Sequence, residues 1–273
     1  MKAVEGRIPF RGFETWYRDV GPEDGNPLLC LHGGPGSTHN YFEPLERLAD
    51  RSRRVVFYDQ LGCGNSDRPD DPELWTLDLF LDELQTVRDE LGLEQVHLLG
   101  TSWGSMLALE YVLGKPSGLV SLTLNAPPTA AETWAAESAR LRAPLAEDEA
   151  VAEKQFWQRH VCRLDPWPDC VLRGRAGRNK QVYEVMWGPQ EWNPTGRLRD
   201  WDVRDRLSEI DLPTLITSGR YDCCTPRLAE EAHRRIHGSE WVLLEESSHT
   251  AFLEEPERFR AILTDFLARA EAA

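Results

Sequence analysis

The chain of 273 residues lacks several features that would place it in whole classes of protein. No apolar run approaches the roughly 18 residues that span a bilayer, so we expect no membrane-spanning segment. The start of the chain, MKAVEGRIPF, has no apolar stretch behind its basic residue, and a secretory signal is not expected. Positive charge is scarce, since 46 acidic residues outnumber 31 lysines and arginines. The net charge of −15 disfavours nucleic acid and anionic membranes as partners.

The six cysteines form no C-x-x-C pair, which disfavours both a zinc site and a disulfide framework. We therefore expect reduced thiols in a cytoplasmic protein. Adjacent Cys223 and Cys224 allow a redox or metal role, but packing by small side chains is the simpler interpretation. No metal or nucleotide motif occurs, so we expect no cofactor and no metal site. The oligomeric state stays open, and a monomer is compatible with the sequence.

Short apolar segments alternate with helical patterns along most of the chain. The segment Val4–Val20 alternates polar and apolar residues, as an antiparallel hairpin does. Strands buried on both faces are expected at Leu28–Leu31, Val55–Tyr58, Val96–Leu99, Leu119–Leu124, Thr214–Thr217 and Trp241–Leu244. Helices are expected at Thr76–Leu91, Met106–Leu113, Pro226–Ile236 and Pro256–Ala270. This order predicts an α/β domain whose mostly parallel sheet is flanked by helices.

The alternation stops between residues 127 and 205, where the composition favours helices and six of the ten tryptophans lie. We interpret residues 127–205 as a helical cap, or lid, inserted between two core strands. Residues 1–126 and 206–273 then form the core. The tryptophans could pack a small core of the cap itself, line the roof of a pocket, or do both.

The segment GTSWG at residues 100–104 matches the pattern G-x-S-x-G, between a predicted strand and a predicted helix that begins near Ser105. This is the context of a nucleophile elbow, in which a sharp turn lifts a serine hydroxyl clear of the sheet. Glycines on both sides leave room for the turn. The motif therefore predicts an α/β-hydrolase fold with Ser102 as the nucleophile.

A second glycine-rich segment, HGGPG at residues 32–36, follows the strand expected at Leu28–Leu31. Its glycines let backbone N–H groups approach a reacting carbonyl oxygen, as an oxyanion hole requires. We assign one donor to Gly34 and the other to the N–H of Trp103. An ordinary glycine-rich turn is the alternative, but both loops occur in the order that the fold needs. His32 is expected to brace its loop rather than to act as a base.

The base should be a histidine after the last core strand, and of seven histidines only His249 has that position. The acid should follow an earlier strand, and Asp222 ends the segment GRYD after Thr214–Thr217. The fold sometimes places its acid after the strand expected at Leu119–Leu124, but that position holds Asn125, which has no carboxylate. The chain order Ser102, Asp222, His249 is the order that this fold demands.

These motifs resemble those of the proline iminopeptidases, a family of α/β-hydrolases. The resemblance lies in HGGPG at 32–36, DQLGCGNS at 59–66, the elbow GTSWGS and the acid segment GRYD. It extends over almost the whole chain, cap included, and is strongest to the type associated with the tricorn protease. It implies a cytoplasmic serine aminopeptidase that removes an N-terminal residue, preferably proline, from short peptides or amino-acid amides through an acyl-enzyme. Asp59 is expected to be structural.

The resemblance also implies an anionic anchor for the substrate amine. The segment WGPQEW at 187–192 resembles the family's G-P-x-E stretch, whose glutamate contacts that amine, and this implies Glu191 as the anchor. Flanking tryptophans would partly desolvate the carboxylate and strengthen the pairing. The alternative is a surface glutamate at a helix end. One departure from the family is Cys223, which stands where relatives often carry a second anchoring glutamate.

That departure leaves other functions open. A carboxylesterase or lactonase would act on small acyl esters without recognising an amine, and rates on matched ester and aminoacyl substrates separate the two. A non-catalytic binding protein on the same scaffold is a third hypothesis, against which the complete set of Ser102, Asp222 and His249 argues. A dehalogenase or an epoxide hydrolase would need aspartate at the elbow, so Ser102 excludes both.

Overall fold

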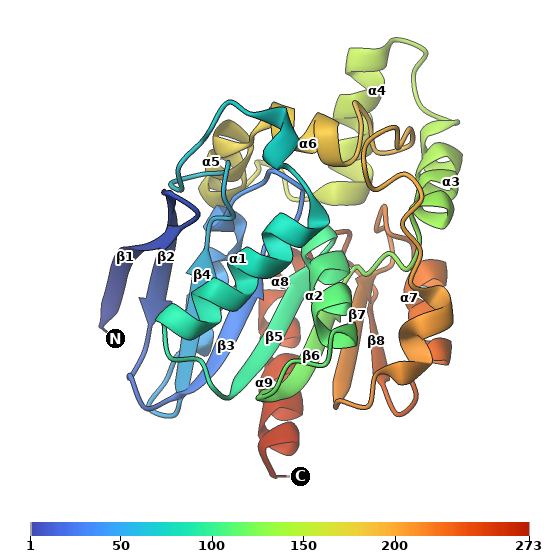
Figure 1. The fold of residues 1–273 in the computed structure, drawn as a ribbon. Helices are drawn as coiled ribbons and strands as arrows, with labels where there is room; N and C mark the ends of the chain where they lie inside the picture. Colours follow the sequence, from blue (N-terminus) through green and yellow to red (C-terminus); the bar gives the residue numbers. More distant parts are fainter. Residues whose placement is uncertain (1, 273) are drawn as a thin grey trace.

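Within residues 2–272, the protein is built around one sheet of eight strands, which Figure 1 shows from one face. The structure is a computed structural model and describes residues 2–272. The strands are β1 (Ala3–Phe10), β2 (Phe13–Val20), β3 (Asn26–Leu31), β4 (Arg53–Tyr58), β5 (Val96–Thr101), β6 (Leu119–Asn125), β7 (Thr214–Gly219) and β8 (Glu240–Leu244).

The order of the strands in the sheet is β1-β2-β4-β3-β5-β6-β7-β8. β2 pairs antiparallel with both β1 and β4, whereas all other pairs are parallel. The predicted N-terminal hairpin and the mostly parallel sheet are therefore confirmed. Each predicted apolar run lies within one of these strands.

Helices cover both faces of the sheet because its central strands are apolar on both sides. One face carries α1 (Leu77–Glu90), α2 (Trp103–Leu113) and α7 (Pro226–Arg235), and the other carries η1 (His39–Leu48), α8 (Ala251–Glu254) and α9 (Pro256–Ala272) (Figure 1). Along β3, Leu29 and Leu31 join the apolar cluster on the α2 face, whereas Leu28 and Cys30 join the cluster on the α9 face. The predicted helices are confirmed, although α2 begins at Trp103 rather than near Ser105.

Between β6 and β7 the chain leaves the sheet and forms the helices at the top of Figure 1, and we call residues 127–205 the helical insertion. It contains α3 (Ala131–Arg142), α4 (Glu149–Phe156), the π-helical turn η3 (Trp157–Val161), α5 (Asp169–Gly177) and α6 (Lys180–Met186), and η4 (Arg204–Glu209) overlaps its end. Trp134 and Trp187 are buried, pack with ring centroids 4.5 Å apart, and belong to the same apolar cluster as the α2 face of the sheet. Trp157 instead lines a cavity over the sheet.

Loops at the carboxyl ends of parallel strands meet beneath the insertion, where α/β sheets commonly bind their ligands. HGGPG follows β3, Ser102 follows β5, Asp222 follows β7 and His249 follows β8. Within residues 2–272, no helix is both long enough and apolar enough to cross a membrane.

Candidate active site

Ser102 occupies the sharp turn between β5 and α2. Its backbone has φ 60° and ψ −123°, a region that side-chain-bearing residues seldom adopt. A Cβ at Gly100 would lie 2.3 Å from the carbonyl oxygen of Gly104, and a Cβ at Gly104 would lie 1.9 Å from that of Leu31. The N–H of Ser102 donates to the carbonyl of Asn125 at 3.1 Å. Both glycines of the motif are therefore needed for the close backbone approach that holds the serine at the cavity.

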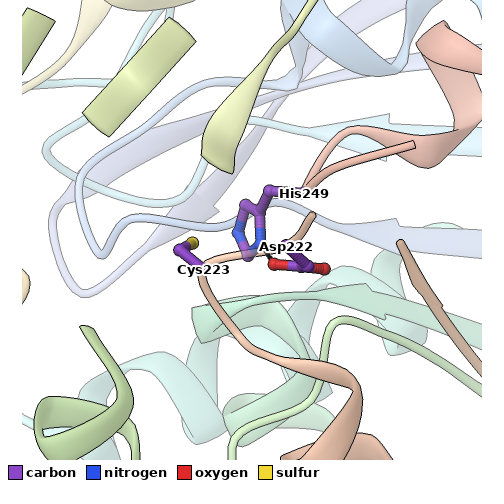
Figure 2. A group of neighbouring side chains, drawn as sticks. All are labelled: Asp222, Cys223 and His249. Carbon is purple, nitrogen blue, oxygen red and sulfur yellow. Dashed lines mark hydrogen bonds and ion pairs between the residues drawn. The ribbon is translucent and has the colours of Figure 1, made fainter. Parts of the chain in front are cut away.

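His249 and Asp222 are hydrogen-bonded, with Nδ1 of the imidazole 2.6 Å from Oδ1 of the carboxylate (Figure 2). The N–H of Cys224 donates to the same oxygen at 2.8 Å and orients the carboxylate. Burial by itself would lower the pKa of His249, but the charge and hydrogen bond of Asp222 outweigh burial, so this pKa is raised. Since Nδ1 faces Asp222, Nε2 is the nitrogen left for Ser102, which lines the same cavity.

Asn125 connects the elbow to the loop that carries His249. Its amide nitrogen donates to the carbonyl of His249 at 3.2 Å, and its Oδ1 accepts from the hydroxyl of Thr217 at 3.0 Å. Its backbone carbonyl accepts from the N–H of Ser102. The position where some relatives of this fold place their acid therefore holds a buried amide that joins the elbow, strand β7 and the His249 loop.

The HGGPG segment lies directly against the elbow, because a Cβ at Gly33 would be 3.1 Å from the Cβ of Ser102. The N–H of Gly33 is already used, since it donates to the hydroxyl of Tyr41. Gly34 lines the cavity with φ 119°. Trp103 is the first residue of α2, so the helix does not use its N–H. Gly34 and Trp103 stay the predicted oxyanion donors.

His32 and Asp59 have structural contacts. His32 is fully buried, its Nε2 accepts from the N–H of Gln60 at 3.0 Å, and burial lowers its pKa to about 4. The carboxylate of Asp59 accepts from the N–H groups of His39 at 2.7 Å and Asn65 at 2.9 Å. Neutral His32 therefore braces the HGGPG loop, and Asp59 organises the loop that follows β4.

Glu191 reaches the cavity from the helical insertion. Its Oε2 is buried and has no hydrogen-bond partner among residues 2–272. Burial raises the pKa of this carboxyl group, against the opposing effects of the Arg178 charge, the Tyr183 hydroxyl and His249. An unpaired buried carboxylate oxygen costs free energy, so the arrangement favours a ligand that brings a positive charge or a hydrogen-bond donor.

Cys223 lies beside these groups, and single atoms of Asp222, Cys223 and His249 are within 4.8 Å of one another (Figure 2). A metal could in principle use such a trio, but it would need a thiolate and a free imidazole nitrogen. Burial raises the pKa of the Cys223 thiol well above its usual range, and Nδ1 of His249 is engaged with Asp222. The thiol packs with Phe156 and Val161 in an apolar cluster. Its surroundings therefore fit packing better than metal ligation.

Several cavity residues escaped the sequence analysis because no local pattern marks them. Arg178 and Tyr183 act on Glu191, and Arg175 lines the cavity from α5. Trp157, by contrast, is one of the tryptophans for which a place in the roof of a pocket was an open alternative. The one available signal was the density of arginine in RGRAGR at residues 173–178. That signal could not distinguish a cavity wall from a solvated surface.

The turn between β5 and α2, with an aspartate after β7 and a histidine after β8, is the arrangement of the α/β-hydrolases. The family model described as alpha/beta hydrolase fold matches residues 26–256. A proline iminopeptidase of Lactobacillus acidophilus is 43% identical over 98% of this chain and 99% of its own length. The chain therefore belongs to the proline iminopeptidase family of α/β-hydrolases.

Solved structures agree with this assignment. The crystal structure of VinJ superposes with a TM-score of 0.93 at 36% identity, covering 98% of this chain and 99% of that chain. A proline iminopeptidase of Mycobacterium smegmatis gives a TM-score of 0.90 at 36% identity, with the same coverage of both chains. The predicted fold and the predicted family are confirmed, and the likeness to the tricorn-associated type stays a prediction.

Proposed function

We propose that the protein is a serine aminopeptidase that removes an N-terminal residue, preferably proline, from short peptides or amino-acid amides. The observation that carries this proposal is the unpaired, buried carboxylate oxygen of Glu191 in the cavity that Ser102 and His249 line. A carboxylate at this place favours the ammonium group of a free N-terminus, which an internal peptide bond lacks. The preference for proline rests on the relatives named as proline iminopeptidases.

The catalytic steps follow from the positions of three side chains. Oγ of Ser102 attacks the carbonyl carbon while Nε2 of His249 accepts the hydroxyl proton, and Asp222 stabilises the resulting imidazolium. The N–H groups of Gly34 and Trp103 bind the oxyanion, each contributing roughly 2.7–4 kcal/mol to transition-state stabilisation. The C–N bond then breaks as His249 protonates the leaving amine. Water hydrolyses the acyl ester, releases the amino acid and restores Ser102.

We infer that residues 127–205 act as a cap over a core formed by 1–126 and 206–273. Support comes from the cavity wall, to which the insertion contributes η3, α5, α6 and Glu191. The cavity has a volume of about 90 Å³, which suits a short substrate better than a long chain. The six cysteines are buried and unpaired, which supports a reducing compartment and a cytoplasmic enzyme.

The carboxylesterase or lactonase alternative is less favoured. A neutral acyl ester offers no partner to the buried oxygen of Glu191, so that carboxylate would stay unpaired in the complex. The relatives at 40–43% identity are named as proline iminopeptidases rather than as esterases.

The test is kcat/KM for the p-nitroanilides of proline, alanine and leucine beside p-nitrophenyl acetate and butyrate. Turnover of the prolyl anilide above the other two supports the proposal. Rapid hydrolysis of the esters without hydrolysis of the anilides would mean that the protein is an esterase and not an aminopeptidase. Labelling by a serine-directed fluorophosphonate separates both outcomes from a non-catalytic protein, which would not react.

A further inference from the structure

Arg175, near the end of α5, lines the active-site cavity but has no part in the catalytic steps. The ion pairs of this helix belong to Arg173, which contacts Glu43 and Asp169. Among residues 2–272, no carboxylate oxygen lies within 4 Å of the Arg175 guanidinium. Arg175 is exposed, so water solvates its charge in the free protein and the guanidinium is accessible to a ligand.

Two tryptophans hold the guanidinium of Arg175. Its Cζ lies 4.2 Å from the ring centroid of Trp157 and 5.0 Å from that of Trp167. Contacts of this kind use the flat faces of the guanidinium and leave the N–H groups at its edge free to donate. Because the rings already restrict the side chain, a ligand that pairs with it has less conformational entropy to remove.

Arg178, the other arginine of the cavity, is engaged within the protein. Its charge lowers the pKa of the Glu191 carboxyl group against the effect of burial, which favours the ionised form of that group. Its Cζ also lies 3.9 Å from the ring centroid of Tyr183. The acidic side chain whose charge acts on Arg175 is Glu153, at more than ion-pair distance. Among residues 2–272 neither arginine has an ion pair within 4 Å, but the charge of Arg178 acts on Glu191, whereas Arg175 interacts with Glu153, which does not line the cavity. Arg175 is therefore the cation that can bind a ligand without weakening the effect on Glu191.

We propose that Arg175 binds the C-terminal carboxylate of short peptide substrates, so that the site recognises both ends of a zwitterion. The ammonium group pairs with Glu191 and the carboxylate with Arg175, and the proposal rests on the aminopeptidase function above. A guanidinium edge matches a carboxylate with two parallel hydrogen bonds. The net charge of −15 opposes the approach of an anionic peptide end, and a local cation at the cavity offsets it.

The experiment compares prolyl-glycine with prolyl-glycinamide, which differ in the terminal carboxylate. We expect kcat/KM of the unaltered protein to be roughly tenfold higher for the free acid, mainly through KM, as one charged pair predicts. In Arg175→Gln the ratio of kcat/KM for the free acid to kcat/KM for the amide should fall toward one. Arg175→Lys should give an intermediate ratio, because lysine keeps the charge but lacks the two parallel N–H donors of the guanidinium. The matched control Arg173→Gln alters an arginine of the same helix that pairs with Glu43 and Asp169, and it should keep the ratio.

Equal kcat/KM for acid and amide in the unaltered protein would overturn the proposal, even if no variant folds. Equal losses on both substrates in Arg175→Gln would overturn it as well. Failure of the aminopeptidase function would look different, since prolyl p-nitroanilide has no carboxylate and its turnover tests that function by itself.

Discussion

The backbone N–H of Cys223 donates a hydrogen bond of 3.0 Å to the carbonyl oxygen of His160, which joins the Asp222 loop to η3. The loop that carries His249 is tied to the same turn, because Thr250 donates to the carbonyl of Val161 through its N–H at 3.2 Å and its hydroxyl at 3.0 Å. π-Helical turns are rare and recur at functional sites. Here one such turn holds the loops of both the proposed acid and the proposed base.

The variant Cys223→Ser tests whether the thiol serves packing or chemistry. We expect a loss of about 1–3 kcal/mol in unfolding free energy, since a hydroxyl would be buried among apolar side chains. The kcat/KM on prolyl p-nitroanilide should change by less than about tenfold, because no catalytic step uses the thiol. Urea unfolding and steady-state kinetics measure the two effects.

The control for this variant is Cys30→Ser, which places a hydroxyl at a buried cysteine of β3 that does not line the cavity. It should lower stability to a similar extent and leave the rate alone. A folded Cys223→Ser protein that loses several orders of magnitude in rate would show that the thiol takes part in the reaction.

Ser102→Ala should lower kcat by on the order of 10⁶-fold, because the attacking oxygen is removed while substrate binding stays. Alanine can occupy the same strained backbone position, so the unfolding curve should match that of the unaltered protein. Fluorophosphonate labelling should disappear together with hydrolysis. Labelling that persists in the variant would assign the nucleophile to another residue.

Asp222→Asn should lower kcat by roughly 10⁴-fold, since the amide no longer stabilises the imidazolium of His249. The pH profile should change as well. His249 must be neutral to accept a proton, so kcat/KM falls when the pH drops below its raised pKa. Removing the carboxylate charge lowers that pKa, and the acid limb should move to lower pH.

The profile is best measured with p-nitrophenyl acetate, because this substrate has no amine whose binding depends on the charge of Glu191. The charge of Glu191 also raises the pKa of His249, but it does so in both the unaltered protein and the variant, so the comparison isolates Asp222. An acid limb that stays in place in Asp222→Asn would mean that the carboxylate does not set the pKa of His249.

Glu191→Gln should reduce kcat/KM on prolyl p-nitroanilide by the equivalent of roughly 2–5 kcal/mol, which is typical for one partner of a buried charge pair. The same variant should hydrolyse p-nitrophenyl butyrate nearly as fast as the unaltered protein. Glutamine keeps the shape of the side chain, so packing is preserved. Glu147→Gln, at an exposed glutamate of the insertion that does not line the cavity, is the matched control.

The dependence of KM on pH is a second test of the role of Glu191. Burial raises its pKa, so KM for the anilide should rise as the pH falls through that raised value, because the protonated carboxyl group no longer pairs with the amine. The rise should be absent in Glu191→Gln. Equal losses on anilide and ester would instead give Glu191 a structural role.

The sequence by itself determined the elements whose information is local. Strands β3 to β7 could be predicted because a strand buried on both faces must be a short apolar run. β8 was found by the same apolar pattern, although it lies at the edge of the sheet and is mostly half-buried. The elbow could be predicted because only glycine tolerates the backbone approach at Gly100 and Gly104. The order of Ser102, Asp222 and His249 followed from their positions after particular strands.

Only the tertiary structure decided which polar groups of the site have partners. The buried oxygen of Glu191 and the guanidinium of Arg175 each lack an ion pair within residues 2–272. Neither observation could be inferred from the identity of the amino acid alone. The hydrogen bond between Cys223 and His160 joins segments far apart in the chain. Whether a charged group is paired depends on every element that packs around it, which no local pattern of residues records.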